Sequence, residues 1–295
     1  MKKLISRYKN GNYNVAIFED GTKIRFNDLD NLKPDFPESM DMKISNYCPF
    51  NCPMCHEKSS TNGKYGNILN NNFIKTIHEN TELALGGGAV TFHPDLIPFL
   101  NELKQQKIIT SITINQQEWD KEKIGYLIDN KLIYGLGVSF VDMNDKIWDE
   151  ILSYPNSVVH LIAGYHSKEV FEYFANKNAK ILILGYKTYG RGINYYENNS
   201  ENILKNIQDL KEILPELFNK CKVVSFDNLS IKQLDIRNTI GEEKWKEFYM
   251  GDDGAFTMYV DMVENKFARN STSEERFDIG NYSSKEVFDI IRNNK

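Results

Sequence analysis

Two hydrophobic periodicities alternate along this chain, one typical of strands and one typical of helices. Short apolar runs recur between residues 42 and 226, and stretches with apolar residues at three- and four-residue spacing separate them. The predicted strands are Met42–Ser45, Leu83–Leu85, Ile109–Ile114, Tyr134–Phe140, Val158–Ile162, Ile181–Leu184 and Lys222–Phe226. The predicted helices are Asn72–Asn80, Leu96–Gln106, Lys121–Asn130, Lys168–Asn176 and Glu201–Phe218.

The alternation of strands and helices predicts repeated βα units. Such units form a parallel sheet joined by right-handed crossovers. About six or seven of them are enough for a partial TIM barrel, and the ligands of such barrels lie at the C-terminal ends of the strands. We therefore expect an α/β protein with a partial (β/α)6 barrel over residues 41–227.

Both ends of the chain depart from this rhythm. Tyr13–Phe18 and Thr22–Phe26 flank an Asp-Gly turn, which predicts a β hairpin followed by a Pro-containing connector. After residue 240, Phe256–Asp261 and Lys266–Arg269 predict another hairpin, and Ser284–Asn293 predicts a final helix. We expect a small N-terminal β unit at 1–40, the barrel at 41–227 and an α+β extension at 228–295.

Composition indicates an ordinary globular protein. Of the 295 residues, 41% are hydrophobic and 26% are charged, which is enough to bury a large core. The net charge of −5 gives no reason to expect nucleic-acid binding. No stretch approaches the ~20 apolar residues of a membrane helix, and the N-terminus has no apolar signal segment. We expect a soluble cytoplasmic protein.

Three of the four cysteines stand close together. Cys48, Cys52 and Cys55 form a C-x3-C-x2-C pattern, which is typical of a metal or cluster site in a reducing compartment. Three thiolates on one loop can bind three irons of a cubane cluster and leave the fourth iron open. The alternative is a zinc knuckle with His56 as fourth ligand, but adjacent Cys55 and His56 would not easily converge on one ion.

The cysteine pattern directly follows the predicted strand Met42–Ser45, and the combination resembles the radical SAM superfamily. The resemblance implies a radical SAM type of partial barrel and one [4Fe–4S] cluster held by Cys48, Cys52 and Cys55. S-adenosylmethionine (SAM) would bind the open iron. The apolar residue before the last cysteine, Met54, would contact the adenine.

Further segments resemble the SAM contacts of that family. Gly86, Gly87 and Gly88 follow the second strand and resemble its Gly-Gly-Glu motif, with Ala89 at the glutamate position. Ser139 ends a segment similar to the strand whose serine reaches the ribose. The segment Ile181–Gly192 is similar to the sixth strand and its Gly-Arg-Gly turn.

In that turn, Lys187 and Arg191 are candidates for the SAM carboxylate or an anionic substrate. A plain glycine turn, a serine bonded to its own backbone and a solvated loop are the structural alternatives for these three segments. Asp227 and Asn228 follow the last strand and are candidate substrate contacts. His160 lies within a strand and is either a core histidine or a proton-transfer group.

The C-terminal stretch Phe256–Ile291 resembles the SPASM or twitch extension of many radical SAM enzymes. It has no cysteine, and Asn270 stands where an auxiliary-cluster cysteine is expected. The resemblance therefore implies a degenerate extension without metal. The remaining cysteine, Cys221, begins a predicted strand and is interpreted as structural.

The resemblance implies reductive cleavage of SAM to a 5′-deoxyadenosyl radical that abstracts hydrogen from a substrate. A peptide or protein is the favoured substrate, and a flavodoxin or ferredoxin would supply the electron. A small molecule or nucleotide is the alternative substrate. A non-catalytic iron–sulfur or zinc protein that keeps the fold is the alternative to an enzyme, and Ala89 is the feature that supports it.

Overall fold

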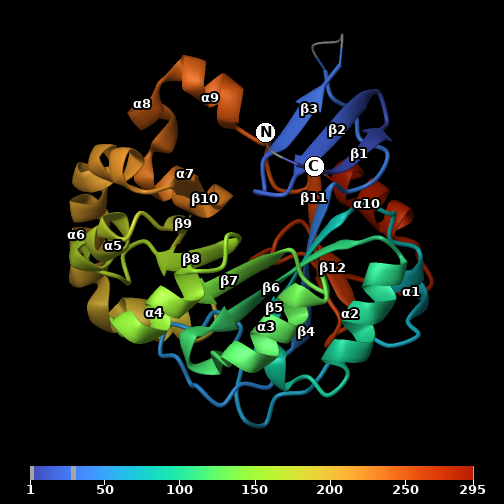
Figure 1. Cartoon of the computed structure of the whole chain (residues 1–295), viewed down its shortest axis with the longest axis horizontal. Coiled ribbons are helices and arrows are strands. Elements are labelled where there is room, and N and C mark those ends of the chain that lie inside the picture. The colour runs from blue at the N-terminus through green and yellow to red at the C-terminus, as the bar shows by residue number, and fades with distance from the viewer. Residues whose placement is uncertain (1–2, 28–30, 295) are drawn as a thin grey trace.

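A ten-stranded sheet forms the centre of the protein (Figure 1). A computed structural model describes residues 3–27 and 31–294, so parts of both predicted terminal units lie outside the described residues. The strand order is β10-β9-β8-β7-β6-β5-β4-β11-β12-β13. The strands are β4 (Ser39–Ser45), β5 (Glu82–Gly87), β6 (Ile109–Asn115), β7 (Gly135–Ser139), β8 (Ser157–Ile162), β9 (Lys180–Leu184), β10 (Val223–Phe226), β11 (Thr257–Asp261), β12 (Lys266–Ala268) and β13 (Phe277–Asp278).

Eight neighbouring strands of this sheet, from β10 to β11, are parallel. The expected mixed α/β fold with a large parallel sheet is therefore confirmed. Strands β10 and β13 stand at opposite edges, and no closed barrel forms among the described residues. Strand β11 pairs in parallel with β4, so the C-terminal region contributes a strand to the main sheet, which the sequence did not predict.

Helices follow most strands and cover one face of the sheet. Figure 1 shows α3, α4, α5 and α6 on the outer side of the strands. Leu96, Phe99, Leu100 and Leu103 of α2 are all fully buried, as their spacing predicts. The helices are α1 (Asn72–Lys75), α2 (Leu96–Gln105), α3 (Lys121–Asp129), α4 (Asp145–Leu152), α5 (Lys168–Asn176), α6 (Arg191–Lys220), α7 (Asn228–Leu234), α8 (Ile236–Ile240), α9 (Glu242–Phe248) and α10 (Ser284–Asn293), with 3-10 turns η1 (Val90–Phe92) and η2 (Gln116–Glu118).

Several helix boundaries differ from the prediction. The first helix is a single turn, because Thr76 ends it by bonding its hydroxyl to the carbonyl of Phe73 at 2.6 Å. Helix α6 begins ten residues early at Arg191 and is kinked at Asn199, whose backbone is not helical. Helices α4, α7, α8 and α9 were not predicted, and three of these four have fewer than eight residues. Among the described residues, no helix is long and apolar enough to cross a membrane.

The N-terminal unit is a separate antiparallel sheet of β1 (Leu4–Asn10), β2 (Tyr13–Phe18) and β3 (Lys23–Phe26). The hairpin of β2 and β3 agrees with the prediction, and β1 adds a third strand. Tyr13, Val15 and Ile17 form a small core of their own with Phe36. Helix α10 lies beside the following connector, since Arg292 donates to the carbonyl of Pro34 at 2.7 Å.

Polar side chains of several strands lie on the face of the main sheet opposite the helices, which we call the polar face. Asp41 is solvent-exposed even though β4 has a neighbour on each side, and Thr113, Ser139 and His160 are half-buried on their strands. Parallel strands end at the same edge, so the loops after β4 to β9 meet there. We call this edge the carboxyl edge and the opposite one the amino edge.

Candidate functional site

The loop after β4 carries the three clustered cysteines to the carboxyl edge. The amide of Cys48 donates to the carbonyl of Ser60 at 2.9 Å, and that of Cys55 donates to the carbonyl of Cys52 at 3.3 Å. All three thiols are free and half-buried. The backbone is therefore fixed at both ends of the cysteine pattern, while the three cysteines stay partly exposed.

Hydrogen bonds from Arg191 connect this loop to the start of α6. Its Nε donates to the carbonyl of Cys52 at 2.9 Å, and its amide donates to the carbonyl of Cys55 at 3.0 Å. The neighbouring Gly190 has a φ of 59°, and a Cβ there would lie 2.3 Å from the carbonyl oxygen of His56. Arg191 thus reaches the predicted site, where it bonds to protein carbonyls; its contact with a carboxylate stays a prediction.

The thiols interact with one another. Burial raises the pKa of the Cys52 thiol, and the neighbouring Cys55 and Cys48 raise it further. Burial also raises the pKa of Cys48. Asn115, at the end of β6, points its side-chain amide at the sulfur of Cys52 at 3.8 Å. Among the residues that the structure describes, no three His, Cys, Asp or Glu side chains are grouped tightly enough to hold a metal ion.

His56 does not join the cysteines as a fourth ligand. Its Nε2 lies 3.5 Å from Oε1 of Glu57, and burial lowers its pKa. Burial would raise the pKa of Glu57, but the neighbouring His56 and Lys43 hold it at about 2. The imidazole is thus engaged with a carboxylate, which argues against the zinc knuckle.

The glycine run packs directly on the cysteine loop. A Cβ at Gly87 would lie 2.4 Å from the carbonyl oxygen of Ser45, and one at Gly88 would lie 2.2 Å from that of Tyr47. The amides of Gly88 and Ala89 donate to these same carbonyls, each at 2.7 Å. Gly86 differs, because a Cβ there meets nothing within 4 Å. Two glycines permit close backbone contact, and the third faces open space.

Ala89 is fully buried below this run. A glutamate at the same backbone position would have to bury its carboxylate. A different acid lies nearby: Glu118 accepts from the amide and the hydroxyl of Thr91, at 3.0 and 2.8 Å, and from the amide of Asn115 at 2.9 Å. Burial raises the pKa of Glu118. Its oxygens are occupied by protein donors, so it acts as a cap for η1 and η2.

Other predicted residues reach the same edge from later strands. Ser139 ends β7 and pairs in register with Asn115 and His160, so these three form one row across β6, β7 and β8. Lys187, after β9, donates from Nζ to the hydroxyl of Ser271 at 3.1 Å. Met54 is half-buried on the cysteine loop. The structure thus brings together residues from β4, β6, β7, β8 and β9.

Three aspartates, Asp41, Asp227 and Asp253, lie close enough to influence one another. Although Asp41 reaches solvent on the polar face, the protein atoms packed around its carboxyl group desolvate it and raise its pKa; Lys187 lowers this pKa, and Asp253 and Asp227 raise it further. Asp253 accepts from the side-chain amides of Asn228 and Asn270, each at 2.7 Å. Asn270, at the expected cysteine position of the extension, is therefore a structural hydrogen-bond donor.

Two strands carry buried charged residues that the hydrophobic pattern does not predict. Lys43 in β4 and Asp261 in β11 are almost completely buried and form ion pairs at the carboxyl edge. Both residues lie within predicted strands, and a charged residue there indicates an ion pair, because charged residues are rarely buried unless they are paired. The partners could not be identified, since Asp261 is far from Lys43 in sequence.

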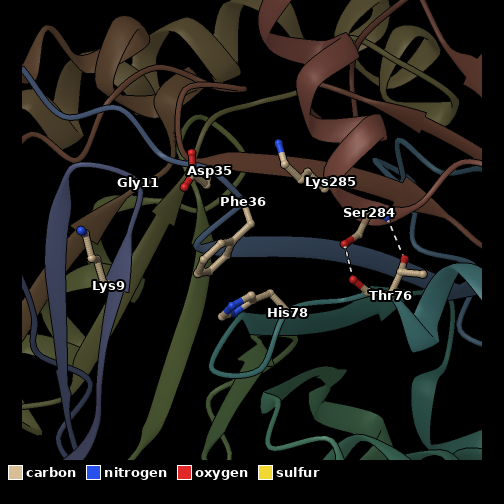
Figure 2. Close-up of a pocket in the computed structure, with 8 residues that line it drawn as sticks. All are labelled: Lys9, Gly11, Asp35, Phe36, Thr76, His78, Ser284 and Lys285. Atoms are coloured by element: carbon tan, nitrogen blue, oxygen red, sulfur yellow. Dashed lines mark hydrogen bonds between the residues drawn. The ribbon is translucent and has the colours of Figure 1, made fainter.

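A cavity of about 590 Å³ lies at the other end of the molecule (Figure 2). Phe36 precedes β4 and His78 precedes β5, so the cavity opens at the amino edge. The two rings stack with centroids 3.6 Å apart. None of the predicted site residues lines it. The lining residues are Lys9, Gly11, Asp35, Phe36, Thr76, His78, Ser284 and Lys285.

Comparison with known proteins gives a structural match. No protein-family model matches the sequence, and no curated protein matches it. Streptococcus suis SuiB bound to its precursor peptide SuiA aligns with a TM-score of 0.60 at 15% identity, over 87% of this chain and 65% of that chain. SuiB bound to S-adenosylmethionine aligns with a TM-score of 0.55 at 15% identity, over 87% and 64%. The chain therefore shares the fold of SuiB and spans about two thirds of the length of that protein.

Proposed function

We propose that this chain is a radical SAM enzyme with one [4Fe–4S] cluster held by Cys48, Cys52 and Cys55. The observation that carries the proposal is the position of the cysteine loop, which leaves a parallel sheet at its carboxyl edge beside a glycine run. Soft thiolates suit iron–sulfur clusters, and three of them leave one iron free for SAM. The shared fold with SuiB, which was solved with S-adenosylmethionine, supports this reading.

When bound, the cluster supplies the electron that cleaves SAM to a 5′-deoxyadenosyl radical. The residues of this chain bind and orient SAM. Gly86 leaves space over β5, Met54 offers an apolar surface for the adenine, and Ser139 offers a hydroxyl for the ribose. Gly87 and Gly88 bring the backbone close to the cysteine loop, and Lys187 and Arg191 supply positive charge for a carboxylate.

The polar face of the sheet is the surface on which we place the substrate. We propose that a peptide or protein substrate lies there, because SuiB was solved with a precursor peptide and shares the fold. The sheet would then act as a partial (β/α)6 barrel over residues 41–227, between the N-terminal unit 1–40 and a metal-free SPASM-like extension 228–295. A cytoplasmic flavodoxin or ferredoxin would be the reductant.

Anaerobic reconstitution tests the proposal directly. One cubane cluster requires about four irons per chain. The reduced protein should convert SAM to 5′-deoxyadenosine, whereas Cys52→Ala should lose both iron and this product. Cys221→Ala is the matched control, because Cys221 is buried at the C-terminal end of α6, before β10, and should be dispensable. Wild-type protein that binds zinc in place of iron, or that forms no 5′-deoxyadenosine, would refute the proposal.

A further inference from the structure

A buried charge network joins the cysteine loop to the C-terminal strand. Nζ of Lys43 in β4 lies 2.7 Å from Oε2 of Glu57 in the loop and 3.2 Å from Oδ2 of Asp261 in β11. The side chains of these residues are 7%, 10% and 1% exposed, respectively. One lysine therefore holds two carboxylates that are separated by about two hundred positions in the sequence.

Besides His56, whose Nε2 lies 3.5 Å from Oε1 of Glu57, two further side chains contact the carboxylates of the network. The hydroxyl of Tyr259 donates to Oε1 of Glu57 at 3.3 Å, and Nη1 of Arg276 lies 3.4 Å from Oδ2 of Asp261. The other oxygen of Asp261 accepts from the amides of Val263 and Glu264 at 3.0 Å. Two cations thus balance two anions, and every group has a partner. Removing one partner would leave an uncompensated buried charge, which is strongly destabilising.

The register of the sheet places this network beside the proposed cofactor site. Asp261 pairs with Lys43, and Lys43 pairs with Gly86, so the three residues form one row across β11, β4 and β5. Glu57 is two residues after Cys55, and its carboxylate is the only link from the loop into this row among the described contacts. Gly66, at the far end of the loop, also packs tightly on Met262, which follows β11.

We propose that Glu57, Lys43 and Asp261 are positioning residues, through which the C-terminal strand holds the cysteine loop in the conformation that receives the cluster. This inference rests on the proposed function. Strand β11 would then be part of the cofactor-binding machinery. Arg191 bonds the loop to α6, and Glu57 contacts β11 directly through the hydroxyl of Tyr259 and indirectly through Lys43, which it shares with Asp261.

Hydrogen exchange in the cluster-free protein tests the network without any cofactor. Glu57→Gln and Asp261→Asn should each speed deuterium uptake in residues 46–66 by about tenfold, equivalent to about 1.4 kcal/mol of local opening. Uptake in residues 201–220 of α6 should stay at the wild-type rate. Glu79→Gln is the matched control, because its ion pair with Lys107 is exposed and remote from the loop. Unchanged uptake in 46–66 would overturn the proposal.

A milder variant guards against general misfolding. Tyr259→Phe removes only the hydroxyl that contacts Glu57, and it should raise uptake in the same segment by a smaller factor. Uptake that rises equally throughout the molecule in this variant would also overturn the proposal. With cluster loaded, Asp261→Asn should broaden or shift the electron paramagnetic resonance g-values, whereas a merely structural role would leave them at the wild-type values. If wild-type protein binds no cluster, the proposed function fails, yet the exchange experiment still decides the role of the network.

Discussion

Replacing Gly88 with alanine tests the packing of the glycine run on the cysteine loop. The new Cβ would lie 2.2 Å from the carbonyl oxygen of Tyr47 and 2.9 Å from its carbonyl carbon. An ordinary carbon–oxygen contact is about 3.3 Å, so the backbone of Tyr47 must move by about 1 Å. This movement would break the 2.7 Å bond from the amide of Ala89 to the same oxygen.

The cost follows from these two effects. Overpacking a rigid site costs about 1–3 kcal/mol, and losing a buried backbone hydrogen bond costs about 1 kcal/mol more. We therefore expect Gly88→Ala to lower the free energy of unfolding by about 2–4 kcal/mol. In a chain of this size, that corresponds to a fall in melting temperature of about 3–6 °C. Iron uptake should also fall, because Tyr47 directly precedes Cys48.

Gly86→Ala is the matched control in the same run. Its Cβ meets nothing within 4 Å, so the melting temperature should not fall. The methyl group would instead occupy the space proposed for SAM, and SAM affinity should decrease. Thermal unfolding and SAM titration of the two variants separate these effects. Gly88→Ala with wild-type stability, or Gly86→Ala with an equal loss of stability, would refute this account of the glycines.

Three further predictions concern other parts of the molecule. Burial lowers the pKa of His160 to about 4, below the value of 6.5 expected when unfolded, so the unfolded state binds more protons between these pH values. The contribution of His160 to the free energy of unfolding should therefore be fully present above pH 6.5 and be lost as the pH falls toward 4. In urea unfolding measured across this pH range, His160→Gln should reduce the dependence of the free energy of unfolding on pH. An unchanged pH dependence would show that His160 is not the group responsible. Lys187→Met should remove the hydrogen bond to Ser271 and speed deuterium uptake in residues 269–276; unchanged uptake there would show that this bond does not hold the segment in place. Fully reconstituted protein should not exceed about four irons per chain, and eight irons would show a second cluster.

Local periodicity was sufficient to predict the main strands and their parallel arrangement. Each predicted strand from Met42 to Phe226 overlaps a strand of the structure, because buried parallel strands are short apolar runs bounded by turns. The short helices α7, α8 and α9 were missed, since their stability depends on packing and not on an amphipathic repeat. Strand β1 was also missed. Its buried side chains are Ser6, Tyr8 and Asn10, and because two of these three are polar, the strand lacks the alternation of apolar and polar residues that predicts a strand.

The candidate site shows the same division. The spacing of Cys48, Cys52 and Cys55 and the glycine run can be read from contiguous residues, and their interpretation as a cofactor site needs no tertiary information. The role of the glycines did need it, because a close approach to Tyr47 is a property of two loops. The bond from Arg191 to the carbonyl of Cys52 likewise joins segments that are far apart in the sequence, and the contact of Arg191 with a carboxylate stays a prediction.

What the sequence determined by itself was therefore local: the βα rhythm, the hairpin near the N-terminus and the cysteine loop after β4. Only the tertiary structure decided that β11 lies beside β4 and that Asp261 shares Lys43 with Glu57. The physical reason is that the pairing of distant strands depends on burial of the whole sheet, which no short segment encodes. A charged residue within a predicted strand indicates that an ion-pair partner is needed, and the tertiary structure determines which residue that partner is.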